Sequence, residues 1–291
     1  MNDFADLCIR AENLLSRLEE MISQRAAEPD WNAVAFRWRR HGHKGFLQPV
    51  AHPHRIRLEL LRGIETQKES LDQNTRQFVN GYPANNVLLT GARGTGKSSL
   101  IKAMLDRYAE AGLRLIEVEK QDLTDLQDIV EKIYQRPERF ILYCDDLSFE
   151  AGEPGYKTLK VVLDGSVATA SENVLVYATS NRRHLMPEYM RDNLDTRHID
   201  GEIHPSESVE EKTSLSERFG LWISFYPFNQ DEYLDIVRQW LAYFDIHEMS
   251  PPVREAALRW SIARGARNGR VAWQFARDWA GRQQAGHDAE G

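Results

Sequence analysis

Residues 91–99 read Gly91-Ala92-Arg93-Gly94-Thr95-Gly96-Lys97-Ser98-Ser99, and the first eight fit the pattern G-x-x-x-x-G-K-[ST] in full. A short apolar run, 87–90, precedes this loop and a helical pattern, 98–109, follows it. Glycines let the backbone wrap closely around an anion, and the N–H groups at the helix N-terminus then face it. Lys97 is expected to reach the β- and γ-phosphates of a nucleotide, and Ser98 to bind Mg²⁺. The stretch therefore predicts a phosphate-binding loop (P-loop).

Two acids follow a second apolar strand, predicted at residues 140–144. Asp145 is expected to hold Mg²⁺ through water at the carboxyl end of this strand, where open α/β sheets bind ligands. Asp146 stands where such sites usually carry a Glu that orients water, and it is one methylene shorter. Three interpretations stay open: the water lies closer to Asp146, Glu150 takes part, or hydrolysis is slow.

A third strand, predicted at 174–179, ends in small polar residues, Thr179-Ser180-Asn181. Asn181 is expected to hydrogen-bond the γ-phosphate or the attacking water. An Asn that merely starts a turn is the alternative. The order of the three motifs along the chain favours the functional interpretation.

Short apolar strands alternate with helices from residue 87 onward. Strands are predicted at 87–90, 114–118, 140–144, 174–179 and 222–225, and helices at 98–109, 123–134 and 156–170. Such alternation is typical of an α/β fold with a parallel sheet that is covered by helices on both faces.

The flanking parts of the chain have a different character. Leucines and isoleucines at helical spacing predict an amphipathic helix up to about Arg25. After Pro227, Asn229 and Glu232 form a capping pattern that begins a small all-helical module. Four segments result: a helical and basic N-terminal segment, 1–53; a nucleotide-binding core, 54–226; a helical lid, 227–284; and a disordered tail, 285–291.

The composition is that of a soluble globular protein. The chain has 291 residues, of which 42% are hydrophobic and 28% charged, and its net charge is −7. This acidic balance gives no global argument for nucleic-acid binding. Two cysteines, Cys8 and Cys144, are too few for a disulfide framework and indicate a reducing compartment, so we expect a cytoplasmic protein without a membrane segment.

The stretch 31–62 contains seven Lys and Arg residues and one acid, with Trp31, Phe36 and Trp38 interleaved. It could bind single-stranded nucleic acid through stacking and charge. Docking onto acidic residues of its own chain is the favoured interpretation. Four histidines lie in the same stretch, at positions 41, 43, 52 and 54, but no Cys or acidic ligand accompanies them, which disfavours a metal site.

Taken together, the motifs resemble Walker A, Walker B and sensor 1 of AAA+ ATPases. Residues 216–220, Ser-Glu-Arg-Phe-Gly, are similar to the arginine-finger box, and Gly269-Arg270 to sensor 2. Further similarity, including Tyr156-Lys157-Thr158-Leu159-Lys160, spans residues 55–282 and resembles a bacterial AAA+ family known as domain of unknown function 815.

This resemblance implies a five-stranded parallel AAA+ core with a helical lid, and ATP bound with Mg²⁺ between subunits of a ring or open ring. Arg218 would act on the nucleotide of the neighbouring subunit, Arg270 would reach the nucleotide from the lid, and residues 60–64 would lie near the adenine. The leading hypothesis is an ATPase that switches or remodels an unknown protein partner. The main alternative is a low-turnover adaptor or loader that binds nucleic acid or a replication-type protein. A small-molecule kinase is disfavoured by the arginine finger and the lid.

Overall fold

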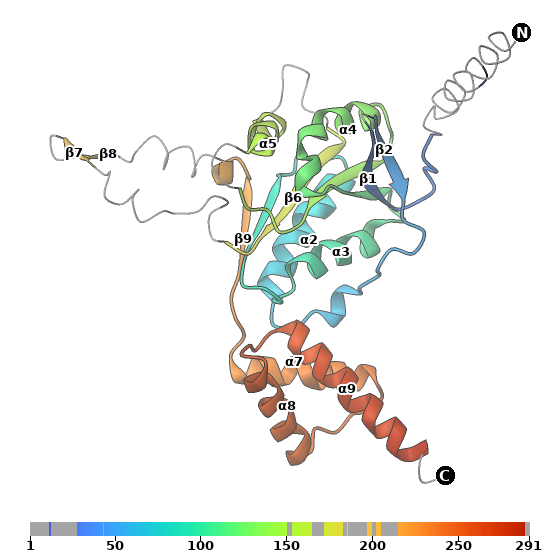
Figure 1. Ribbon diagram of the computed structural model, residues 1–291, viewed down its shortest axis with the longest axis vertical. Helices are drawn as coiled ribbons and strands as arrows, with labels where there is room; N and C mark the ends of the chain where they lie inside the picture. Colours follow the sequence, from blue (N-terminus) through green and yellow to red (C-terminus); the bar gives the residue numbers. More distant parts are fainter. Residues whose placement is uncertain are drawn as a thin grey trace, which may run out of the picture.

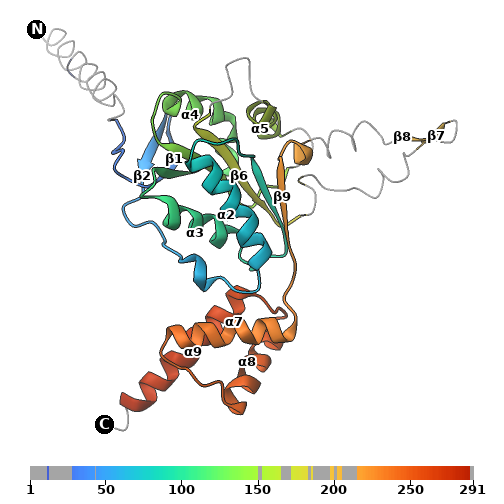
Figure 2. The same ribbon diagram turned by 180° about the vertical axis from the view of Figure 1, so that it is seen from behind.

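The computed structural model describes residues 12, 28–42, 44–149, 153–164, 172–182, 185, 197–199, 202–204 and 215–288. An α/β core forms one end of the molecule and a helical module the other (Figures 1 and 2). The two are joined where the chain leaves the last strand of the core. The helix predicted up to Arg25 lies outside the described residues, apart from Glu12.

The core contains one large sheet. Its strand order is β2-β1-β4-β5-β6-β3-β9, with bounds Lys44–Pro49, Ala35–His41, Leu113–Glu117, Arg139–Cys144, Val174–Ser180, Val87–Gly91 and Leu221–Phe225. All neighbouring pairs are parallel except β1 and β2, which form an antiparallel hairpin. The α/β class is confirmed, but the expected five strands are seven, because the hairpin adds two strands beside β4. A separate two-stranded pairing joins β7 (Arg197–Ile199) to β8 (Glu202–His204).

Helices cover both faces of this sheet (Figure 1). On one face lie α2 (Glu65–Val79) and α3 (Lys97–Tyr108), and on the other α4 (Leu126–Ile133), which follows the 3₁₀ turn η2 (Lys120–Asp125), and α5 (Pro154–Asp164). Successive strand residues enter opposite cores: Tyr143 packs on the α3 side and Leu142 on the α4 side. Strands buried on both faces are near-continuous apolar runs, which explains why the sequence shows them clearly.

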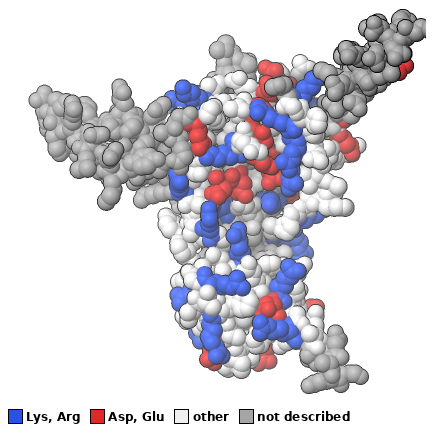
Figure 3. Space-filling view, in the orientation of Figure 1, with Lys and Arg blue, Asp and Glu red and all other residues white. Residues whose placement is uncertain are grey.

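The hairpin lies within the N-terminal segment 1–53, where helical structure and no strand were predicted, and it corrects that prediction for residues 35–49. Along β1, Phe36 and Trp38 are buried, whereas Arg37 is exposed, which is the period of a half-buried strand. Arg37 pairs with Glu117 over 2.6 Å, and Arg39 pairs with Glu119 over 2.6 Å. Basic and acidic side chains accordingly lie interspersed over the core on the face shown in Figure 3. The predicted docking of the basic stretch onto acids of its own chain is therefore confirmed for strand β1.

The helical module contains α7 (Gln230–Tyr243), α8 (Pro251–Ala263) and α9 (Gly269–Asp288). Asn229 and Glu232 form the predicted capping box at the start of α7. The last helix continues to Asp288, so it enters the segment 285–291 that was predicted to be disordered. Within the described ranges, no helix is both long and apolar enough to cross a membrane.

Candidate functional site

The P-loop lies between β3 and α3, as predicted. Gly91 ends the strand with a φ of 129°, and Gly96 precedes the helix with a φ of 105°. A Cβ atom at Gly91 would lie 2.0 Å from the carbonyl oxygen of Phe225 in β9, so no side chain fits there. The glycines therefore allow the loop both its left-handed backbone and its close approach to the neighbouring strand.

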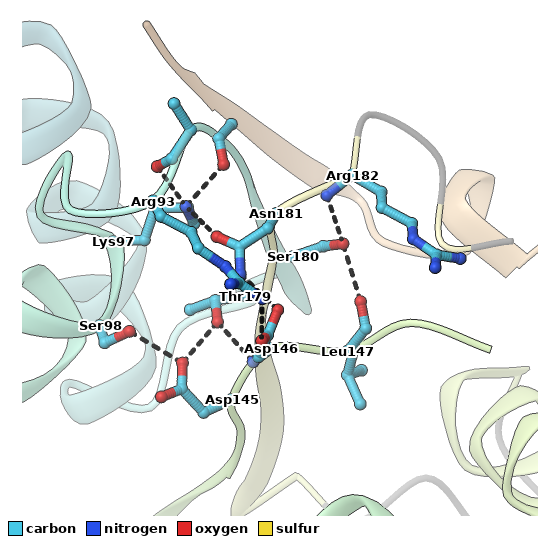
Figure 4. Close-up of polar contacts among 12 residues, drawn as sticks. Arg93, Lys97, Ser98, Asp145, Asp146, Leu147, Thr179, Ser180, Asn181 and Arg182 are labelled. Atoms are coloured by element: carbon cyan, nitrogen blue, oxygen red, sulfur yellow. Dashed lines mark hydrogen bonds and ion pairs between the residues drawn. The ribbon is translucent and has the colours of Figure 1, made fainter. Parts of the chain in front are cut away.

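Lys97 begins α3 and is buried, with 6% of its surface exposed. Its ammonium donates hydrogen bonds to the carbonyl oxygens of Gly91 (2.7 Å) and Ala92 (2.8 Å), and to Asn181 Oδ1 (3.0 Å; Figure 4). Burial lowers the pKa of Lys97, against the opposing effect of the nearby carboxylates. A buried ammonium beside a glycine-rich loop is suited to bind a phosphate oxygen.

Asp145 follows β5 and is held by two hydroxyl groups. Ser98 Oγ donates to Asp145 Oδ1 over 2.8 Å, and Thr179 Oγ1 donates to the same oxygen over 2.6 Å. Burial works to raise the pKa of Asp145, but these hydrogen bonds outweigh it, so the pKa lies below its usual value. A hydroxyl and an ionised carboxylate are hard oxygen donors, and this set fits Mg²⁺. Thr179 is a part of the site that the sequence reasoning missed.

Asp146 has a left-handed backbone, with a φ of 52°. Its N–H donates to Thr179 Oγ1 over 2.9 Å, and its side chain accepts a hydrogen bond from Asn181 Nδ2. Arg93 Nη2 lies 3.5 Å from Asp146 Oδ2 (Figure 4). The structure therefore brings the predicted residues Asp146 and Asn181 together, while Glu150 lies outside the described residues.

A cleft of about 700 Å³ joins these groups to the helical module. Its size lies within the range of small-molecule sites. The predicted site residues that line it are Arg93, Gly94, Thr95, Gly96, Lys97, Ser98, Ser99, Asp145, Asp146, Asn181 and Arg270. Leu60, Leu61 and Ile64 also line it, as do Trp240 and Trp273 of the helical module. The cleft thus offers an apolar, partly aromatic end and a charged end, which fits the base and the phosphates of a nucleotide.

The helical module also contacts the P-loop directly. Asn268 Nδ2 donates to the carbonyl oxygen of Arg93 over 3.2 Å. The N–H of Gly269 donates to the carbonyl oxygen of Gly94 over 3.0 Å. Asn268 Oδ1 in turn accepts from the N–H of Val271 in the first turn of α9. The start of α9, which carries Arg270, is therefore fixed to the loop by two hydrogen bonds.

Arg218 does not join this cleft. It lies in the turn before β9, and its Nε forms an ion pair of 2.6 Å with Asp164 Oδ1 at the end of α5. In the parallel register, Leu221 pairs with Val87 at the start of β3, whereas the P-loop follows the end of β3, so Arg218 lies toward the opposite edge of the sheet from the P-loop of its own chain. Its expected action on a neighbouring subunit stays a prediction.

The α/β core, with its P-loop between β3 and α3, polar strand ends beside the loop and a C-terminal helical module, is similar in fold to AAA+ P-loop ATPases. The chain belongs to the family described as "Protein of unknown function (DUF815)", whose model matches residues 31–283. The match begins just before β1, so the hairpin lies within the matched region. A comparison with curated protein sequences found no match.

Solved structures are similar to this chain at low sequence identity. The Orc1 protein of Aeropyrum pernix, solved in complex with DNA, is 15% identical with a TM-score of 0.54, over 77% of this chain and 60% of that one. The RuvB Holliday junction branch migration motor of Thermotoga maritima is 18% identical with a TM-score of 0.47, over 76% of this chain and 63% of that one. This chain therefore spans less than two thirds of either structure.

Proposed function

We propose that this protein binds ATP with Mg²⁺ in the cleft and hydrolyses it between two copies of the chain, to switch or remodel a partner. One observation carries the proposal: Lys97, Asp145, Asp146 and Asn181 converge at the charged end of one cleft. A P-loop lysine beside a strand-end carboxylate is the arrangement that phosphoryl transfer uses.

Each residue has a defined task in this proposal. Lys97 holds the β- and γ-phosphate oxygens, and Ser98 and Asp145 hold Mg²⁺, which when bound neutralises charge on the phosphates. Asp146 and Asn181 orient the attacking water. Arg270 reaches the nucleotide from the helical module, and Arg218 of the adjacent copy stabilises the charge that develops in the transition state.

The proposal is tested by calorimetry with ATP and Mg²⁺ and by ATP turnover measured against protein concentration. Lys97→Ala should lose nucleotide binding, because the main side-chain charge that faces the phosphates is removed. Lys132→Ala is the matched control, since Lys132 is an exposed lysine on α4 away from the cleft. Unchanged affinity in Lys97→Ala would refute the nucleotide site.

A low-turnover adaptor or loader is the second candidate, and the state of Asp146 favours it. This carboxylate is shorter than a glutamate and is engaged by both Asn181 and Arg93. Slow hydrolysis together with nucleotide-dependent capture of nucleic acid or a protein partner would support this candidate. Fast ATP turnover by an oligomer of this protein would support the first candidate, a cytoplasmic ATPase that switches or remodels a partner.

A further inference from the structure

The P-loop is expected to bind phosphate through its backbone N–H groups, which leaves the position of the Arg93 side chain unexplained. Arg93 lies at the third position of the loop, and 75% of its side chain is exposed. It lines the same cleft as Lys97, and its guanidinium points to Asp146 (Figure 4). An arginine is thus supplied to the charged end of the cleft by the nucleotide-binding chain itself.

The present partner of Arg93 holds it weakly. The ion pair with Asp146 is 3.5 Å long, and 53% of the Asp146 side chain is exposed. Exposed ion pairs of this kind contribute little free energy. Arg93 and Lys97 line the same cleft, so two cations face the same space. An anion that entered between them would satisfy both.

The backbone of Arg93 is held more firmly than the end of its side chain. The carbonyl oxygen of Arg93 accepts a hydrogen bond from Asn268, and that of Gly94 accepts one from the N–H of Gly269. A change of partner by the guanidinium would therefore need rotation of the side chain alone, without movement of the backbone. A planar guanidinium binds a phosphate group through two parallel hydrogen bonds, which a single carboxylate oxygen at 3.5 Å does not match.

We propose that Arg93 exchanges Asp146 for the γ-phosphate when ATP binds, and so acts as an arginine supplied in cis. This inference rests on the proposed function. The exchange has two effects: it places a second cation on the γ-phosphate beside Lys97, and it frees Asp146 to accept a hydrogen bond from water. ADP lacks the γ-phosphate, so Arg93 stays with Asp146 in that complex. The site thereby distinguishes the two nucleotides within one chain.

The test compares the affinities for ADP and for a non-hydrolysable ATP analogue, measured by calorimetry with Mg²⁺. Arg93→Ala should weaken binding of the analogue roughly ten- to hundred-fold and leave ADP binding within about two-fold, because a charge-assisted pair is lost from one ligand alone. Arg93→Lys should restore part of the loss. Arg267→Ala is the matched control: this exposed arginine next to Asn268 does not line the nucleotide cleft.

This inference would be overturned if Arg93→Ala lost affinity for ADP and for the analogue equally, or lost affinity for neither. Lys97→Ala tests the proposed function separately from the role of Arg93, because that variant should lose affinity for both ADP and the analogue. Wild-type protein that binds both ligands, with Arg93→Ala unchanged, refutes the role of Arg93 alone. Wild-type protein that binds neither ligand refutes both.

A second variant tests the exchange itself. In Asp146→Asn, Arg93 has lost its counter-ion, so affinity for the analogue should rise, and the rise should vanish in the double variant with Arg93→Ala. No rise would mean that Asp146 and the γ-phosphate do not compete for Arg93. Thermal unfolding should be unchanged in both single variants, because both side chains are largely exposed.

Discussion

The buried hydroxyl of Thr179 donates a hydrogen bond of 2.6 Å to Asp145 Oδ1. The same oxygen of Thr179 accepts from the N–H of Asp146, so one hydroxyl orients both strand-end acids. This arrangement fixes Asp145 toward Ser98, and it helps to explain why Asp146 adopts a left-handed backbone. Thr179 is therefore a positioning residue for the proposed Mg²⁺ site.

Thr179→Val should keep the shape of the side chain and remove both hydrogen bonds. We expect a loss of about 1–3 kcal/mol in the free energy of unfolding, since the N–H of Asp146 is left without its acceptor. The Mg²⁺ concentration needed for half-maximal ATP hydrolysis should also rise. Thr90→Val is the matched control: Thr90 is a buried strand-end threonine whose hydroxyl accepts from Trp222 instead. An equal shift of the Mg²⁺ dependence in both variants would contradict the role of Thr179.

The two acids should have separable effects. Asp145→Asn is expected to bind ATP but lose Mg²⁺-dependent hydrolysis, because a neutral amide is a poorer ligand for a hard cation. Asp146→Asn should retain bound ATP, since no carboxylate orients the water. Single-turnover assays with labelled ATP measure both effects. Normal hydrolysis in Asp146→Asn, with loss in Glu150→Gln, would show that Glu150 is the base.

Arg218→Ala should fold and bind ATP but lose hydrolysis. An arginine finger is worth ~10³-fold or more in rate, because it stabilises charge that develops in the transition state. If the finger comes from another copy, turnover per subunit should rise with protein concentration in the wild type. Mixing Arg218→Ala with Lys97→Ala should restore part of the activity, since each supplies what the other lacks. A concentration-independent rate without rescue would leave a monomeric ATPase.

The hairpin should depend on Asp125, which accepts hydrogen bonds from Arg40 and from Trp38 Nε1. The bond from Arg40 holds the pKa of Asp125 below its usual value, although burial opposes it. A carboxyl whose pKa is lower in the folded state stabilises the protein above its unfolded-state pKa, about 3.9, and this contribution disappears as the pH falls through the folded-state pKa. Asp125→Asn should therefore cost about 1–3 kcal/mol at pH 7 and progressively less below about pH 4.

Urea unfolding at several pH values checks this prediction. Glu119→Gln is the control, because the pair of Glu119 with Arg39 is exposed on both sides and should contribute under about 1 kcal/mol. A pH-independent difference between wild type and Asp125→Asn would show that packing, and not charge, accounts for the loss.

The sequence predicted the parts of the fold whose cause is local. Apolar runs gave β3, β5 and β6, and the spacing around Gly91 and Lys97 gave the loop between β3 and α3. The hairpin was missed because charge was weighed above alternation: Phe36 and Trp38 alternate with Arg37 and Arg39, which is a strand period. Its partners in β4 lie about 80 residues away along the chain, so no local signal names them.

The candidate site divides in the same way. Strand-end residues such as Asp145 and Asn181 were predictable, because the carboxyl ends of parallel strands meet at one edge. The contacts of Thr179 and Arg93 depend on side-chain directions that are set by neighbouring strands and by the helical module. For Arg218 the structure gives a position and an ion pair, and its action on another subunit stays a prediction.

The contact between Asn268 and the P-loop has a consequence for how the loop tolerates mutation. A Cβ atom at Gly94 would lie 2.7 Å from Asn268 Cγ, and the φ of 79° at Gly94 already disfavours other residues. Position 94 is thus constrained by the packing of a second structural unit as well as by the backbone of the loop. Gly94→Ala should weaken phosphate binding by displacing α9, and a smaller residue at position 268 should relieve the clash but not the strain of the positive φ.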